Sequence, residues 1–300
     1  MENNKPLLSV CLITYNHEKF IEQAIESVLM QKINFNWEFI IADDYSTDNT
    51  RAIIKKYADK YPNLIKLILQ EKNVGAARNW LDLIYSPIGK YTAFFEGDDY
   101  WTDPYKLQKQ VDFLEANDDY VICFHKVMIR NGEELVEDFI THVPKGKDSF
   151  TIMDLAKGNF IHTPSVVFRN NLIKLPEWFL ESPIGDYPLY MLLSFHGKIK
   201  LLEDTMAVYR YNVGVWSGMD RMPMLLKWFK MLNLLKTDIP KEIIYEIYQF
   251  QDKNIFLEIE NIWVDLKKEK ESILKSKDYQ LGKLLLSPLR WLRKISKHLF

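Results

Sequence analysis

Apolar runs and helical patterns alternate along the first half of the chain. Continuous apolar runs predict buried strands at 7–14, 37–42, 64–69 and 91–95, since a strand covered on both faces lacks polar alternation. Apolar residues at helical spacing predict a helix capped by Asn16, and further helices at 50–61 and 74–85. This order is typical of an α/β protein with a Rossmann-like, mostly parallel central sheet and helices on both faces.

The regular alternation ends after a helix expected at 105–117. A strand is expected at 119–130, a short helix at 152–157, an extended segment at 162–169 and a helix at 186–196. Two short strands, 199–202 and 206–211, would extend the first sheet. From Met222 onward the pattern is helical, so we expect one domain at 1–218 and a helical extension at 219–300.

Composition narrows the class of protein. Hydrophobic residues make up 47% and charged residues 27% of the chain, as in ordinary folded proteins. The net charge of −2 gives no general attraction to nucleic acid, and we expect no nucleic acid partner. The N-terminus lacks a signal-peptide pattern and no apolar run is long enough to span a bilayer. Cys11 and Cys123 lie in apolar runs, which favours reduced thiols in a cytoplasmic protein.

Polar and acidic residues follow each predicted strand. Right-handed crossovers bring the carboxyl ends of parallel strands to one edge of the sheet, where α/β proteins bind ligands. The residues delivered to this edge are Thr14, Tyr15, Asn16, Asp43, Asp44, Asn73, Glu96, Asp98 and Asp99.

The segment Glu96-Gly97-Asp98-Asp99 places three acidic residues close together after the fourth strand. Mg²⁺ and Mn²⁺ prefer oxygen ligands and are commonly held by one or two carboxylates together with substrate phosphates. Gly97 leaves room for a diphosphate. Taken alone, the segment favours a solvated acidic turn, because such turns are common. The neighbouring Tyr15 ring, suited to base stacking, and the acceptors Asp43 and Asp44 favour a metal-dependent nucleotide site.

Four motifs in this order and spacing resemble inverting family 2 glycosyltransferases with the GT-A fold: SVCLITYN, FIIADDYSTDNT, NVGAARN and FFEGDDYW. The resemblance covers roughly residues 7–211. It implies that Tyr15 stacks on the nucleotide base and that Asp44, with Asp43 as its rival, binds that base. It also implies that Asp98 and Asp99 hold the ribose and a divalent metal, Mn²⁺ or Mg²⁺, that bridges to the diphosphate.

The resemblance extends to further residues around the nucleotide. Arg78 matches a basic position that faces it, and Glu96 departs from the family's usual Asp, which leaves open which acid ligates the metal. The nucleotide-binding set expected on this basis is Thr14, Tyr15, Asn16, Asp43, Asp44, Asn73, Arg78, Glu96, Asp98 and Arg210.

An inverting transfer needs a carboxylate that takes a proton from the attacking hydroxyl. Asp186 precedes an apolar helix with Pro188 in its first turn, and the resemblance implies a catalytic acid at the start of such a helix. An ordinary helix N-cap explains the same residue, and the two roles are compatible. We expect Asp186 to be the catalytic base.

Three further residues are weaker candidates. His162 would face the acceptor or the diphosphate, although a lone His beside an apolar strand is commonly structural. The segment 208–218 contains Arg210, suited to phosphate oxygens, and Trp216. The resemblance implies that this loop closes over the nucleotide; an exposed arginine beside a packed tryptophan is the alternative.

The C-terminal segment 283–300 is basic and amphipathic. Its basic residues and its apolar residues fall at helical spacing, and no acidic residue follows Asp278. This pattern favours a helix lying on an anionic membrane surface, with a terminal helix docked on the protein as the alternative. The basic residues are Lys283, Arg290, Arg293, Lys294 and Lys297.

Together these observations predict a glycosyltransferase that moves a sugar from a nucleotide-sugar, expected to be a UDP-sugar, to a hydroxyl of a glycan or lipid-linked acceptor. The resemblance places it in cell-surface polysaccharide synthesis at the inner face of the plasma membrane. A non-catalytic nucleotide-sugar-binding protein would not need Asp186. A sugar nucleotidyltransferase would need a glycine-rich basic loop after the first strand, which the sequence lacks.

Overall fold

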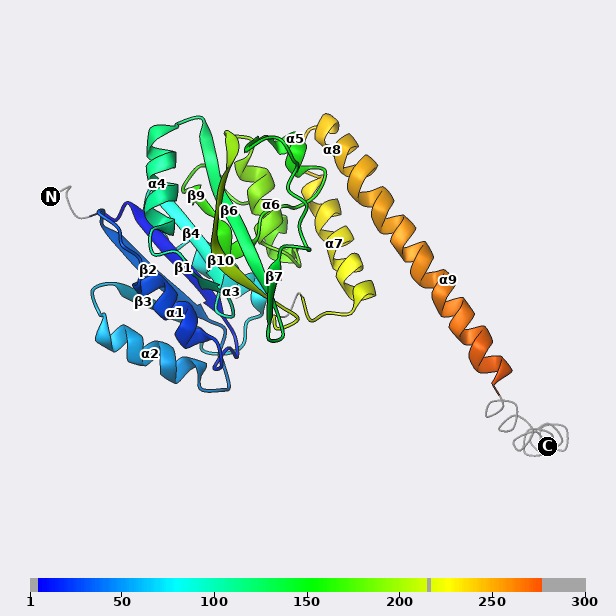
Figure 1. Ribbon diagram of the computed structural model, residues 1–300, viewed down its shortest axis with the longest axis horizontal. Coiled ribbons are helices and arrows are strands. Elements are labelled where there is room, and N and C mark those ends of the chain that lie inside the picture. Colours follow the sequence, from blue (N-terminus) through cyan, green and yellow to red (C-terminus); the bar gives the residue numbers. More distant parts are fainter. Residues whose placement is uncertain (1–4, 215–216, 277–300) are drawn as a thin grey trace. The chain divides into compact units, whose positions relative to one another are not determined.

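The computed structural model describes residues 5–214 and 217–276 of the chain (Figure 1). Trp216 and the amphipathic segment 283–300 lie outside the described residues. Two compact units are present, one ending at Asp252 and the other beginning at Lys253. The expected boundary near Gly218 stays a prediction.

In the part of the chain described, ten strands form one mixed sheet in the order β3-β2-β1-β4-β9-β6-β10-β5, with β7 beside β6 and β8 beside β10 (Figure 1). Strands β1 to β4 are parallel, and β9 is antiparallel to both β4 and β6. The strands are β1 Leu8–Thr14, β2 Trp37–Asp43, β3 Ile65–Leu69, β4 Tyr91–Glu96, β5 Tyr100–Trp101, β6 Tyr120–Asn131, β7 Glu134–Glu137, β8 Ser149–Phe150, β9 Val167–Arg169 and β10 Lys198–Tyr211.

Helices cover both faces of the sheet. The chain moves outward from β1 to β3 and then returns to β4, so right-handed crossovers put α1 and α2 on one face and α3 on the other. The helices are α1 Ile21–Leu29, α2 Thr50–Lys60, α3 Ala76–Ile84, α4 Lys106–Ala116, α5 Ile152–Leu155, α6 Asp186–Leu193, α7 Arg221–Leu235, α8 Lys241–Ile247 and α9 Lys253–Lys275, with short 3₁₀ turns at Thr163–Ser165 and Glu177–Glu181.

The main core lies between the parallel strands and their helices. Successive residues of β1 and β2 are buried, including Val10, Cys11, Phe39 and Ile40, because helices cover both faces of these strands. The free thiols of Cys11 and Cys123 are both buried, as the apolar runs predict.

Two local expectations are wrong. Asn16 does not cap α1, which begins at Ile21; Asn16 has a φ of 54° and its side chain accepts a hydrogen bond from the Thr47 backbone N–H at 2.8 Å. The two short strands expected at 199–202 and 206–211 form a single strand, β10. Polar residues interrupt the apolar pattern there, but pairing with β6 continues through register shifts between Leu202 and Ala207.

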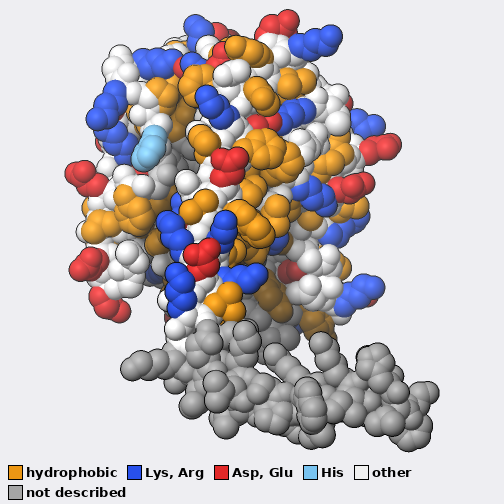
Figure 2. All heavy atoms as spheres, turned by 90° about the vertical axis from the view of Figure 1, so that its right-hand side faces the viewer, with side chains coloured by type: hydrophobic (Ala, Val, Ile, Leu, Met, Phe, Trp, Pro, Cys, Tyr) orange, Lys and Arg blue, Asp and Glu red, His pale blue; other side chains and the backbone are white. Residues whose placement is uncertain are grey.

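Within the described residues, every helix is too short or too polar to cross a lipid bilayer. Figure 2 shows a face on which basic, acidic and hydrophobic side chains are intermixed.

Candidate active site

Strand register brings the predicted residues to one edge of the sheet. Thr14 at the end of β1 pairs with Asp43 of β2, and Ile13 pairs with Glu96 of β4. Strand β10 runs parallel to β6, and β9 runs antiparallel to both β4 and β6. The carboxyl end of β10, with Arg210, therefore reaches the same edge.

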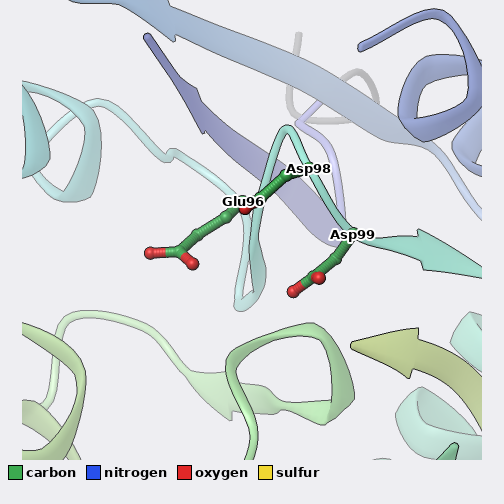
Figure 3. A group of neighbouring side chains, drawn as sticks. All are labelled: Glu96, Asp98 and Asp99. Atoms are coloured by element: carbon green, nitrogen blue, oxygen red, sulfur yellow. The ribbon is translucent and has the colours of Figure 1, made fainter. Parts of the chain in front are cut away.

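The acidic cluster forms at this edge. Glu96, Asp98 and Asp99 leave the end of β4 and the turn that follows it (Figure 3), and one carboxylate oxygen of each lies within 4.8 Å of the others. Asp98 is 3% exposed and Asp99 is 1% exposed. The cluster is therefore mostly buried, unlike the solvated turn that was its alternative.

Glu96 and Asp99 both have a raised pKa. Burial, together with the charges of Asp98 and Asp186, raises the pKa of Glu96 to about 8. Burial and the charges of Asp98 and Glu96 raise the pKa of Asp99 well above its usual range. Carboxylates this close disfavour one another's ionisation, and a cation between them removes that cost.

Two buried oxygens of the cluster favour binding of a divalent cation. Oδ1 of Asp98 and Oδ2 of Asp99 are buried and accept no hydrogen bond in the part of the chain described. Buried carboxylate oxygens are normally paired or bound to metal. A set made only of carboxylates suits Mg²⁺ or Mn²⁺, so the residues present fit such an ion.

Arg210 closes one side of the cluster. Its backbone N–H donates to Asp99 Oδ1 at 2.8 Å, and its guanidinium donates to the Asp98 carbonyl and to Gln23 Oε1. The guanidinium also lies between the rings of Phe20 and Tyr100, 4.8 Å and 4.7 Å from their centroids. Arg210 is thus a buried residue that fixes the acidic turn, and not an exposed arginine.

Two glycines permit close packing around the acids. A Cβ on Gly97 would lie 2.9 Å from Thr14 Oγ1, so this glycine lets the turn after β4 pack against β1. The expectation that Gly97 also makes room for a diphosphate stays a prediction. A Cβ on Gly214 would lie 2.8 Å from Asp98 Oδ2, so the backbone after β10 lies directly against the cluster.

The expected base-binding residues lie at the ends of β1 and β2. The Tyr15 ring is 38% exposed and available for stacking. Asp43 forms an ion pair with Arg51 at 2.6 Å and bonds with Ser46, so both of its oxygens are engaged. Oδ1 of Asp44 accepts from the Val74 backbone N–H at 2.7 Å, and burial raises the pKa of Asp44.

Other expected nucleotide contacts have partners within the protein. Asn73 donates to the Asp44 carbonyl at 3.3 Å, which joins the end of β2 to the start of α3. Thr14 Oγ1 lies 3.2 Å from His17 Nδ1. Arg78 is paired with Asp82 on its own helix at 2.8 Å, so it does not join the acidic cluster in this arrangement.

Asp186 is the first residue of α6, and Gly185 occupies the N-cap position. The side chain is therefore not the helix cap. Burial raises its pKa, while the first backbone N–H groups of α6, the charge of His162 and the Thr163 hydroxyl act in the opposite direction. The charge of Asp186 contributes to the raised pKa of Glu96, so the helix start and the acidic cluster face a common space.

His162 lies on the Asp186 side of the cluster. It is 8% exposed, its ring packs 4.9 Å from the Tyr209 ring, and its Nε2 lies 3.0 Å from Asp138 Oδ2. Asp138 was not among the expected residues. The hydrogen bond and charge of His162 oppose the effect of burial and bring the pKa of Asp138 well below its usual range.

The comparison of the chain with protein families agrees with this geometry. The profile of the family described as Glycosyl transferase family 2 matches residues 9–171, more than half of the chain. The chain belongs to this family.

The relatives of this family 2 chain include proteins that are named for the synthesis of bacterial surface polysaccharides. An uncharacterized protein of Mycobacterium tuberculosis is 38% identical over 212 residues, which are 70% of this chain and 60% of that protein. The chain thus spans less than two thirds of that relative. The putative teichuronic acid biosynthesis glycosyltransferase TuaG of Bacillus subtilis is 36% identical over 59% of this chain and 69% of its own.

Solved structures confirm the expected GT-A fold of the family 2 chain. S. aureus TarS in complex with UDP aligns with a TM-score of 0.60 at 20% identity, over 81% of this chain and 70% of that chain. The mannosyltransferase PcManGT of Pyrobaculum calidifontis, in complex with GDP-Man and Mn²⁺, aligns with a TM-score of 0.59 at 13% identity, over 94% and 84%.

Several residues of the site cannot be identified from the sequence of this family 2 chain alone. Arg51, Gln23 and Asp138 lie in a helix or a loop with no motif, and each reaches the site only through the tertiary fold. Asp43 ends β2 and Arg51 lies in α2, so their pairing depends on how the chain turns between these two elements. Only the tertiary structure identifies these residues.

Proposed function

We propose that the protein is an inverting glycosyltransferase that moves a sugar from a nucleotide-sugar donor, preferably a UDP-sugar, to a hydroxyl of a glycan or lipid-linked acceptor. The observation that carries this proposal is the buried acidic cluster next to Asp186, two of whose oxygens have no partner among the described residues. Family membership supports the same reaction.

The nucleotide would bind along the carboxyl edge of the sheet. Tyr15 would stack on the base, and Asp44 would accept its N–H, since the oxygens of Asp43 are already engaged by Arg51 and Ser46. Glu96 would reach a ribose hydroxyl. Asp98 and Asp99 would hold the divalent cation, which supplies Lewis-acid stabilisation of the departing diphosphate.

Asp186 would accept the proton of the acceptor hydroxyl as that oxygen attacks the anomeric carbon. Attack on the face opposite the nucleotide breaks the bond to the diphosphate in the same step, so the configuration inverts and no covalent enzyme intermediate forms. General bases of this kind contribute about 10²–10⁴-fold to rate. The raised pKa of Asp186 makes it a better base than an exposed aspartate.

The relatives suggest the setting. TuaG is named for teichuronic acid biosynthesis and TarS was solved with UDP, which supports a UDP-sugar donor and cell-surface polysaccharide synthesis. The basic segment 283–300 supports a place on the inner face of the plasma membrane, near a lipid-linked acceptor.

Calorimetric binding of UDP, GDP, CDP and TDP tests the proposal. The titrations use wild type and Asp98→Ala, each with Mn²⁺ and with chelator. We expect UDP to bind wild type with Mn²⁺, and binding to be lost with chelator or in Asp98→Ala. Asp59→Ala is the control, because Asp59 is an exposed acid of α2 outside the cluster.

A second assay follows release of free sugar or transferred product from UDP-glucose, UDP-galactose and their N-acetyl forms. Turnover that stops in Asp186→Asn supports the catalytic role of this residue. Absence of nucleotide binding under all conditions would contradict the proposal.

A further inference from the structure

The segment 138–142, between β7 and β8, is a loop held by one carboxylate. Oδ1 of Asp138 accepts hydrogen bonds from the backbone N–H groups of Ile140 at 2.8 Å and Thr141 at 3.1 Å. Its Oδ2 accepts from the Thr141 hydroxyl and lies 3.0 Å from His162 Nε2. Asp138 therefore fixes the loop and ties it to His162.

The loop packs against the carboxyl end of β10. Tyr209 and Tyr211 lie on the same face of that strand, because side chains two residues apart share a face. The His162 ring packs against Tyr209, and the Phe139 ring meets Tyr211 at 5.4 Å with an interplanar angle of 80°. The loop thus contacts one face of β10 at two neighbouring side chains. Asp138 reaches Tyr209 through His162, and Phe139 contacts Tyr211 directly.

This surface adjoins Asp186. His162 immediately precedes the 3₁₀ turn Thr163–Ser165, which packs against β4, the strand that carries Glu96. The hydrogen bond of the Thr163 side chain and the charge of His162 both lower the pKa of Asp186. The loop is therefore joined through His162 to the residue expected to receive the acceptor proton.

The loop presents apolar side chains to solvent. Phe139 is 49% exposed and Ile140 is 39% exposed. A T-shaped contact leaves at least one face of the Phe139 ring free of Tyr211. The face of an aromatic ring carries negative potential and attracts polarised C–H groups, and a pyranose ring offers such groups on its apolar face.

We propose that Phe139 is a stacking platform for the acceptor sugar, held beside Asp186 by the Asp138–His162 contact. This inference rests on the proposed function, since the acceptor hydroxyl must reach Asp186. A hexose of the growing glycan is the occupant, because its apolar ring face covers Phe139 while its hydroxyl groups remain free to face Asp186.

Ligand-observed saturation-transfer NMR tests the platform. Methyl glycosides of glucose, galactose, rhamnose and N-acetylglucosamine are added to the full chain with UDP and Mg²⁺, which is diamagnetic. The variants are Phe139→Ala, Phe139→Tyr and Asp138→Asn. Tyr85→Ala is the control, because Tyr85 is 62% exposed and follows α3 at the opposite edge of the sheet.

We expect at least one glycoside to bind wild type, Tyr85→Ala and Phe139→Tyr alike. Loss of the ring in Phe139→Ala should weaken that binding about tenfold, which is about 1.4 kcal/mol. Asp138→Asn should also weaken it by releasing the loop. Calorimetric UDP binding should be unchanged in all of these variants.

Equal glycoside binding by wild type and Phe139→Ala would overturn the platform and leave the proposed function intact. Absence of glycoside binding to wild type that still binds UDP would also overturn it. Failure of wild type to bind UDP with Mn²⁺ would instead contradict the proposed function, so the two failures are distinguishable.

Discussion

Asp186 combines a position at the first turn of α6 with a raised pKa. The backbone N–H groups at a helix start stabilise a carboxylate, whereas burial opposes its ionisation. Burial is the larger effect here, so the group takes up a proton at a higher pH than an exposed aspartate does. A carboxyl of this kind accepts a proton readily and remains close to the acidic cluster.

Asp186→Asn removes the proton acceptor while keeping the shape of the side chain. We expect kcat for sugar transfer to fall by about 10²–10⁴-fold, as for loss of a general base, with UDP affinity within a factor of about two. In wild type, kcat should fall as pH falls through the raised pKa of Asp186, because only the ionised form accepts a proton. Steady-state kinetics across the acid pH range measure kcat, and calorimetry measures the UDP affinity. A variant with wild-type kcat would exclude Asp186 as the base.

Lys106 is a buried lysine outside the proposed site. It is fully buried, donates to Gln110 Oε1 at 2.8 Å and lies 4.2 Å from the Trp101 ring centroid. Burial lowers its pKa to about 7, against a smaller opposing effect of Cys123. The unfolded chain therefore binds a proton that the folded chain lacks from about pH 7 to about pH 10.

This lysine predicts a pH-dependent stability difference. The free energy of unfolding of wild type relative to Lys106→Met should rise by about 1 kcal/mol per pH unit above pH ~7, because stability rises with pH where the unfolded state binds more protons. Urea unfolding at several pH values measures it. Lys109→Met, on the same helix, is the control: its ion pairs with Asp103 and Asp204 raise its pKa. A pH-independent difference for Lys106→Met would contradict the prediction.

At the scale of elements, the approach of α6 to α3 positions Asp186. A Cβ on Gly185 would lie 2.8 Å from Cε2 of Trp80, which stacks on Phe179 at 5.1 Å. Only glycine allows α6 to begin this close to the Trp80 ring, and the next residue is Asp186. Packing against Trp80 thus explains the glycine at position 185, and the proposed chemistry explains the aspartate at position 186.

Gly185→Ala should displace the start of α6 or the Trp80 ring. We expect a loss of about 1–3 kcal/mol in the free energy of unfolding from overpacking, and a fall in kcat of about tenfold from misplacement of Asp186. UDP binding should change little. Adding Trp80→Leu to Gly185→Ala makes room and should restore part of kcat. Unchanged kcat in Gly185→Ala would show that this packing does not position Asp186.

The elements predicted from sequence are those with strong periodic patterns. The parallel strands β1 to β4 and helices α2 to α4 follow from long apolar runs and helical spacing, and their edge follows from handedness. The sequence predicts two short strands in place of β10, because the polar residues 203–205 interrupt the apolar pattern although the ladder with β6 is continuous. Asn16 has the residue type of a helix cap, but asparagine is equally favoured in a left-handed turn, which is the conformation it adopts.

The residues of the site also divide into those that the sequence places together and those that only the tertiary structure joins. The acids of the cluster follow each other along the chain, so sequence places them together. The bond from the Arg210 backbone to Asp99 and the pairing of Asp138 with His162 join residues far apart in sequence. Such contacts depend on where β10 and the loop after β7 end in space, which local patterns do not encode.

At the scale of the whole molecule, the described site residues all lie in the unit that ends at Asp252. The basic segment 283–300 belongs to the other part of the chain and is expected to bind anionic membranes. Binding of nucleotide and binding of membrane should therefore be separable. Each basic residue near an anionic surface contributes about 1 kcal/mol to attachment, so changing three of them should abolish detectable binding.

The test replaces Arg290, Arg293 and Lys294 by Glu in the full chain. We expect wild type to sediment with vesicles containing phosphatidylglycerol and the variant to stay in the supernatant, because the reversed charges are repelled by the anionic surface. The wild-type protein should be released from the vesicles as the salt concentration rises, since screening weakens this attraction. Vesicles of phosphatidylcholine alone are the lipid control, and UDP binding with Mn²⁺ is the control for folding. If the variant sediments as wild type does, the charges of this segment do not attach the protein to membranes.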